Sequence, residues 1–228
     1  MKKFRKVKIF LAIVMSLFCF AFVSCGEVEV EGGDLIEKAR EDYTSLDSAR
    51  VIMTNTETNQ QEQEFVFKYD EKDVLIFSYY GKDGKDEYAI YNDGMSQDIY
   101  QKGEYKHQTS DDKEFQKYVR NSTYPQADKG MIIYQPESVE NAQVKEDNGV
   151  THIIHEYDVK KIANSDNKDS LKSFTADYYF DKDGKLLYFV ESSTMEKDGK
   201  EENYSYRIDI TEKNEVKSVE NMAEKFKK

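Results

Sequence analysis

The chain has 228 residues and a formal net charge of −12, because 45 acidic side chains outnumber 33 basic ones. This excess of negative charge argues against nucleic-acid binding, since phosphates are bound through clustered Lys and Arg side chains. Both cysteines, Cys19 and Cys25, lie near the N-terminus, so the rest of the chain can form neither a disulfide nor a thiolate metal site.

The N-terminus has the parts of a secretory signal. Five basic residues between Lys2 and Lys8 precede an apolar stretch over residues 9–23, which is short for a spanning helix of roughly 20 apolar residues. The next motif, Phe22-Val23-Ser24-Cys25, resembles the lipobox of bacterial lipoproteins, in which a peptidase cuts before a lipid-bearing cysteine. We therefore predict a signal peptide over residues 1–24 and lipid attachment at Cys25. An ordinary secretory signal with an incidental cysteine is the alternative.

Cleavage before Cys25 would leave 204 residues with a formal charge of −17, because the signal holds five basic and no acidic residues. A chain of this length can bury roughly 70% of its unfolded surface in one domain. We expect the lipidated cysteine and an acidic tether over residues 25–33, followed by a single domain over 34–228. The tether could instead form an edge strand through Val28 and Val30. The expected location is the extracytoplasmic face of a cell membrane, and the Lys-, Glu- and Asn-rich composition favours a Gram-positive host.

The domain is expected to open with a helix. Asp34 and Glu37 form a capping pattern, and apolar side chains recur at helical spacing as far as Leu46. Turn signals rich in Asn-Gly and Asp-Gly then favour antiparallel hairpins. The expected strands cover residues 51–58, 63–70, 73–80, 86–92, 96–101, 129–134, 139–146, 150–159, 173–181, 185–195 and 201–211. A second helix is expected over 111–121, a loop or short helix over 160–172, and helical spacing closes the chain at Val219, Met222, Ala223 and Phe226.

Alternation along the strands predicts how they are buried. Residues 204–210 place Tyr and Ile on one face and Ser, Arg and Asp on the other, as expected of a strand with one solvated face. Residues 74–80 are apolar on both faces, so this strand should be central, with other segments covering each side.

The order of these elements resembles that of the LolA/LolB and LppX-type lipoprotein superfamily. The motifs that carry the resemblance are TSLDSARVIMT after the first helix and YYFDKDGKLLYF in a late hairpin. The resemblance implies an α+β fold in which a strongly curved antiparallel sheet, a half or incomplete β-barrel, has N-terminal, inserted and C-terminal helices packed over its concave side. It also implies an apolar groove that accepts a lipid or another apolar ligand. No ligand-binding residue of the family can be placed on this sequence.

Inward-facing aromatic side chains are the candidates for lining such a groove, or else they complete a solid core. The candidates are Phe65, Phe67, Tyr178, Phe180, Tyr188 and Tyr206. If the core is solid, the protein is instead a protein-interaction or sensory module that meets an envelope partner through an outer surface or an edge strand.

Catalytic and metal-binding patterns are scarce. His152 and His155 lie three apart on a predicted strand and should point to opposite faces, which makes them poor co-ligands. The run Asp181-Lys-Asp-Gly184 fits a hairpin turn better than a calcium loop. The mature chain has no nucleophile elbow and no phosphate-binding loop. We therefore expect a protein that is not an enzyme and has no cofactor and no metal site.

Overall fold

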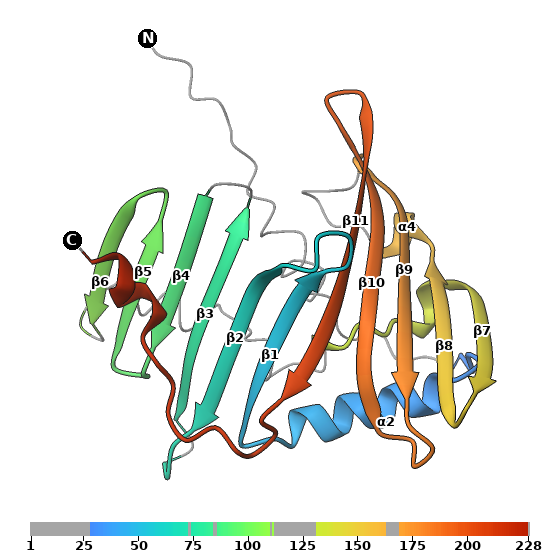
Figure 1. Ribbon diagram of the computed structural model, residues 1–228, viewed down its shortest axis with the longest axis horizontal. Helices are drawn as coiled ribbons and strands as arrows, with labels where there is room; N and C mark the ends of the chain where they lie inside the picture. Colours follow the sequence, from blue (N-terminus) through green and yellow to red (C-terminus); the bar gives the residue numbers. More distant parts are fainter. Residues whose placement is uncertain are drawn as a thin grey trace.

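The computed structural model describes residues 28–72, 74–83, 86–109, 111, 131–162 and 169–227. Eleven antiparallel strands form one sheet in the order β6-β5-β4-β3-β2-β1-β11-β10-β9-β8-β7 (Figure 1). The sheet is not closed, because β6 and β7 form its two edges. The first and last strands along the chain, β1 and β11, pair at its centre. The prediction of a large, open antiparallel sheet is confirmed.

The bounds of the elements follow the predicted hairpins closely. The strands are β1 (Ser48–Asn55), β2 (Gln61–Tyr69), β3 (Leu75–Asp83), β4 (Asp86–Asn92), β5 (Ser96–Gln101), β6 (Glu104–Thr109), β7 (Val139–Asp147), β8 (Val150–Tyr157), β9 (Leu171–Phe180), β10 (Leu186–Lys197) and β11 (Lys200–Thr211). The described helices are α2 (Gly33–Thr44), α4 (Val159–Ile162) and the 3-10 helices η2 (Pro136–Ser138) and η3 (Met222–Phe226).

Tight turns explain why consecutive strands pair. At Lys102-Gly103, Asn148-Gly149 and Asp198-Gly199, both residues between the strands have positive φ. This conformation matches the right-handed twist of a two-residue hairpin, and a glycine adopts it at little cost.

The two faces of the sheet are covered by different segments. We call the side that α2 packs against the helix face; α2 buries Ile36, Ala39 and Tyr43 there. We call the opposite side the strap face, because residues 212–227, the C-terminal strap, cross the strands on it (Figure 1). The strap ends in η3, which lies over β3, β4 and β5.

The strap explains the apolar strand that the sequence predicts to be central. On β3, Phe77 and Tyr79 are buried on the helix face, while the Ser78 hydroxyl accepts a 3.2 Å hydrogen bond from the Met222 backbone on the strap face. Tyr80, also on the strap face, has its ring 6.4 Å from that of Phe226. Both faces of β3 are therefore covered, as predicted.

Three expectations about the elements are wrong. Of the strand expected over 129–134, residues 131–134 form no strand, although Ile132 and Ile133 are buried in the core, and residues 129–130 lie outside the described residues. Strand β6 was not expected, and five of its six residues, all except Tyr105, are charged or polar. The C-terminal helical turn packs on the face opposite α2, so the helices do not share one side of the sheet. The helix expected over 111–121 lies, except for Asp111, outside the described residues.

The N-terminal segment differs in detail from expectation. Gly32, with a φ of 76°, occupies the N-cap position of α2, and Asp34 lies in the first turn without capping it. Residues 28–30 form no strand. The carbonyl of Glu31 accepts a hydrogen bond from His155 on β8, so the end of the predicted tether is held against the sheet.

Candidate functional site

An aromatic cluster lines the helix face of β2, β3 and β4. Phe65 and Phe67 stack with ring centroids 5.7 Å apart, and Phe77 lies 5.9 Å from Phe65. Tyr79 and Tyr88 extend the cluster toward β4, with rings 5.5 Å apart and hydroxyls 3.1 Å apart. Because each buried Phe or Tyr stabilises the fold by about 1.5–3 kcal/mol, this cluster forms a large part of the core.

The described helices on this face lie over the other half of the sheet. In Figure 1, α2 runs behind β11 to β8, and α4 contacts β9 and η2. Near its C-terminal end, α2 places the ring of Tyr43 edge-on to Phe67, 6.0 Å away. In the part of the chain that the structure describes, the helix face is therefore covered by helices mainly over β8 to β11, while the aromatic lining continues to β4.

The structure places five of the six candidate ligand-lining residues on the helix face. Phe65, Phe67, Tyr178, Phe180 and Tyr206 are all buried there, with Tyr206 the most exposed at 8%. The five are spread over β2, β9 and β11, so they line one broad face of the sheet rather than one compact site.

Tyr188 does not share this face. Its ring stacks on Tyr179, 4.4 Å away, and the guanidinium of Arg207 lies 3.8 Å above it, all on the strap face. The cause is an irregularity in the register of β10 against β9: Leu186 pairs with Phe180, but Tyr188 pairs with Tyr179. An extra residue in one strand reverses which face the following side chains occupy.

A buried carboxyl group lies on the helix face of β10. Glu191 is 8% exposed and pairs in register with Ala176 on one side and Tyr206 on the other. Among the described residues, no side chain or backbone group donates a hydrogen bond to it. Burial raises the pKa of Glu191 to about 7, so the group is partly protonated near neutral pH. Sequence reasoning missed Glu191, although its spacing of two from Phe189 predicts an inward position.

His155 is a second buried polar group on this face. Its Nε2 donates a 2.9 Å hydrogen bond to the Glu31 carbonyl, which leaves Nδ1 as a lone-pair acceptor without a partner among the described residues. Burial lowers the pKa of His155, so the neutral imidazole is favoured. His152 points to the strap face, where its Nε2 lies 2.7 Å from Asp177, as the sequence predicted for two histidines of odd spacing.

Tyrosine hydroxyls form a short buried chain beside His155. The hydroxyl of Tyr178 donates to the backbone carbonyl of Ile133 and lies 3.1 Å from the hydroxyl of Tyr157. Burial raises the pKa of both phenols, which keeps them protonated. Within the described part of the chain, no three His, Cys, Asp or Glu side chains are arranged to hold a metal ion.

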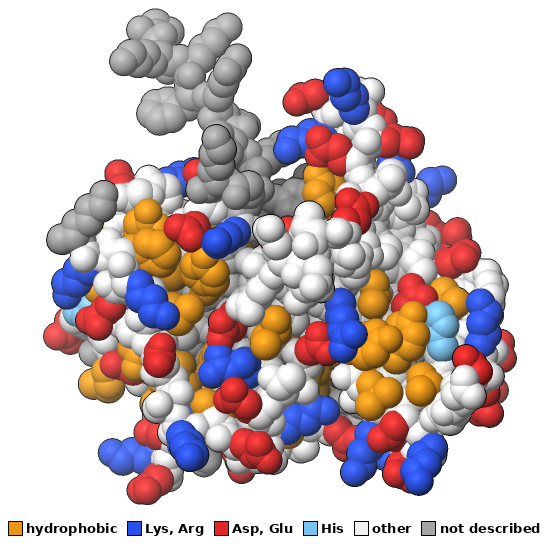
Figure 2. Space-filling view, viewed as in Figure 1, with side chains coloured by type: hydrophobic (Ala, Val, Ile, Leu, Met, Phe, Trp, Pro, Cys, Tyr) orange, Lys and Arg blue, Asp and Glu red, His pale blue; other side chains and the backbone are white. Residues whose placement is uncertain are grey.

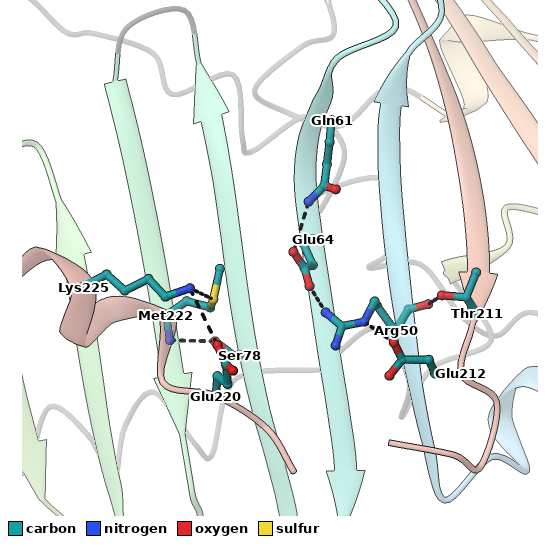
Figure 3. A network of polar contacts seen from close by, with 9 residues as sticks. All are labelled: Arg50, Gln61, Glu64, Ser78, Thr211, Glu212, Glu220, Met222 and Lys225. Carbon is teal, nitrogen blue, oxygen red and sulfur yellow. Dashed lines mark hydrogen bonds and ion pairs between the residues drawn. The ribbon is translucent and has the colours of Figure 1, made fainter. Parts of the chain in front are cut away.

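The strap face carries a groove of about 610 Å³ between the strap and strands β1 to β3. Figure 3 shows the polar contacts along it. The guanidinium of Arg50 forms ion pairs with both Glu64 and Glu212, the latter with a 2.8 Å contact to Nε. The hydrogen bond that the Arg50 guanidinium donates to Glu212 is the main reason that the pKa of Arg50 is raised. Figure 2 shows acidic and basic side chains interspersed over this face. Arg50 on β1 therefore pairs with a carboxylate of the sheet, Glu64, and with one of the strap, Glu212, and so holds the strap to the sheet.

The sequence matches no protein-family model and no curated protein. The structure is similar to the crystal structure of LprF from Mycobacterium bovis, with a TM-score of 0.47 and 11% sequence identity, covering 86% of this chain and 99% of that one. None of the described helices is both long and apolar enough to cross a membrane.

Proposed function

We propose that the protein is a membrane-anchored, extracytoplasmic lipoprotein that binds or carries a lipid or another apolar ligand without catalysis. Its anchor is the acyl group on Cys25, and its host is a Gram-positive bacterium. In this proposal the sheet curves as an incomplete barrel around the ligand. The support for the anchor is the lipobox-like motif at residues 22–25.

One observation carries the ligand-binding part of the proposal. The aromatic lining of the helix face extends from β2 to β4, and a pocket of about 430 Å³ on the same face of β5 and β6 continues it. Apolar ligands are bound in concave, mostly apolar sites with a few polar groups that set orientation. Glu191 and His155 are buried polar groups on the same face, and Nδ1 of His155 has no hydrogen-bond partner among the described residues.

The proposal is tested by the lipid content of the protein as purified from its host membrane. We expect native mass spectrometry to detect a bound apolar molecule, and organic extraction to release it. A matched pair of variants, Phe77→Ser on the helix face and Tyr179→Ser on the strap face, should differ, with only the first losing the molecule. Ligand-free protein in every preparation would overturn the proposal.

A second candidate function is an interaction module of the cell envelope, and the free edges of the sheet favour it. Among the described strands, β6 and β7 each pair on one side only, and an unpaired edge can accept a strand from a partner. Crosslinking in cells should then trap one abundant partner on β6 or β7. Substitution Gln143→Pro in β7 should abolish that crosslink if β7 is the edge used. If substitutions in both edge strands leave every crosslink in place, this function is excluded.

A further inference from the structure

The hairpin of β5 and β6 bears a polar pocket of about 430 Å³ on the helix face. Its lining contains three glutamines, Gln97, Gln101 and Gln108, together with the lysines Lys102 and Lys106. Ile99 supplies the apolar part, and Glu104 is the one acidic side chain among the described residues of the lining. The lining therefore offers many hydrogen-bond donors and a local positive charge, in a chain whose overall charge is strongly negative.

The register of the sheet connects this pocket to the aromatic cluster. Phe65 pairs with Tyr79, Tyr79 with Ile90, Ile90 with Ile99, and Ile99 with Lys106. One row of side chains on the helix face therefore runs from aromatic at β2 through aliphatic at β4 and β5 to cationic at β6. With strands about 4.8 Å apart, the row is about 19 Å long.

The amide groups in the pocket are held in place by one another. Gln97 is fully buried, and its Oε1 accepts a 3.3 Å hydrogen bond from Asn92. Its Nε2 donates a 3.2 Å hydrogen bond to Gln108. An amide nitrogen carries two hydrogens, and no described residue accepts the second hydrogen of the Gln97 amide. The ammonium of Lys106 on the neighbouring strand offers three more.

We propose that this pocket binds the anionic headgroup of a lipid, a carboxylate or a phosphate, while the hydrocarbon chain lies over Ile99 and Ile90 toward the aromatic cluster. The inference rests on the proposed function and specifies its ligand as an anionic amphiphile. Half-buried isoleucines beside donor groups fit such a molecule, because each part meets surface of its own polarity. Charge-assisted hydrogen bonds to the headgroup would fix the direction of the chain along the row.

The experiment uses membranes that contain the full-length protein and two photoactivatable probes, a sixteen-carbon fatty acid with a diazirine in its chain and the corresponding fatty alcohol. We expect the acid to label peptides within residues 86–109 about tenfold more than the alcohol does, the ratio expected for one charge-assisted hydrogen bond. The double variant Lys102→Gln, Lys106→Gln should reduce labelling by the acid to the level of the alcohol. Lys197→Gln, an exposed lysine in the β10–β11 hairpin, is the matched control and should leave labelling unchanged.

The outcomes separate this inference from the function on which it rests. Equal labelling by acid and alcohol, or labelling that the lysine substitutions leave unchanged, would overturn the headgroup site and leave the carrier proposal standing. Absence of labelling of any helix-face peptide by either probe would overturn both. Displacement of the acid by inorganic phosphate at the same concentration would show a site for free anions and would also overturn the lipid assignment. Circular dichroism of the purified variants checks that they fold.

Discussion

The ring of Phe226 lies flat on that of Tyr100, with centroids 4.1 Å apart and planes inclined by 3°. The contact joins the end of the C-terminal strap to β5, one strand from the edge of the sheet (Figure 1). Between β1 and β5 the strap is also held by two backbone contacts: Nζ of Lys68 donates to the carbonyl of Lys217, and the amide of Met222 donates to the hydroxyl of Ser78. The strap therefore ties β5 to the central strands.

Substitution Phe226→Ala should lower the free energy of unfolding by about 1–2 kcal/mol, because it removes a half-buried ring and its stacking contact. Urea denaturation of the variant and the parent protein measures the change. Phe226→Tyr keeps the ring and should stay within about 0.5 kcal/mol of the parent. An unchanged midpoint for Phe226→Ala would mean that the strap does not contribute to the stability of the sheet.

The hairpins could be predicted from the sequence because their signals are local. Asn148-Gly149 and Asp198-Gly199 specify tight turns, and the alternation in residues 204–210 specifies which face is buried. Strand β6 was missed because Tyr105 is its single aromatic or aliphatic residue, so apolar and polar residues do not alternate along it. A local signal was also missing for the strap, whose position depends on contacts with distant strands.

The prediction of the ligand-lining residues was also limited, because contacts with a partner strand leave no local signal in the sequence. Five of the six residues could be placed on one face, because side chains in a strand alternate between the two faces of the sheet. The count fails at Tyr188, because an irregularity in the pairing of β9 and β10 shifts the register just before it. Such an irregularity depends on the partner strand and has no signature in residues 185–195 alone. The polar pocket of β5 and β6 could not be found, since β6 itself was not predicted.

Two buried tyrosines should respond in opposite ways to removal of their hydroxyls. The Tyr43 hydroxyl is buried and has no partner among the described residues, so Tyr43→Phe should be neutral or stabilise the fold by about 1 kcal/mol. Tyr178→Phe should destabilise it by about 1–2 kcal/mol, because the carbonyl of Ile133 and the hydroxyl of Tyr157 lose a partner. Thermal unfolding of the two variants under the same conditions gives the comparison. Equal destabilisation by both would show that Tyr43 makes a hydrogen bond in solution.

The predicted lipid anchor is tested by Cys25→Ser. The residue lies outside the described residues, and the sheet uses no cysteine, so the variant should fold as the parent does. It should lose metabolic labelling with a radioactive fatty acid, because a serine hydroxyl cannot accept the thioether-linked diacylglycerol of a lipobox cysteine. Cys19→Ser is the matched control and should be labelled normally. A Cys25→Ser variant that still carries the label would contradict the assignment of the lipobox.

Glu191 should make the stability of the fold depend on pH in a direction unusual for a carboxyl group. Burial raises its pKa from an ordinary value near 4.5 to about 7, so between these values the folded state binds a proton that the unfolded state has released. Stability should therefore fall as the pH rises from about 4.5 to 7. With about 1.4 kcal/mol for each pH unit, the contribution approaches 3 kcal/mol at pH 8. The pKa of His155 is lowered by burial, so this residue changes the stability only below the ordinary histidine pKa of 6.5. There the stability falls as the pH falls.

Substitution Glu191→Gln removes the group that ionises and should raise the free energy of unfolding at pH 8 by about 2–3 kcal/mol, with little change at pH 4.5. Urea denaturation at a series of pH values measures both. Glu57→Gln, at an exposed turn, is the matched control and should follow the parent at every pH. If Glu191→Gln instead destabilises the protein at pH 8, the carboxylate has a donor in solution, and a polar group of a bound ligand would be the first to examine. Repeating the titration after organic extraction distinguishes the two cases, because a donor within the protein persists and a donor on a ligand is lost.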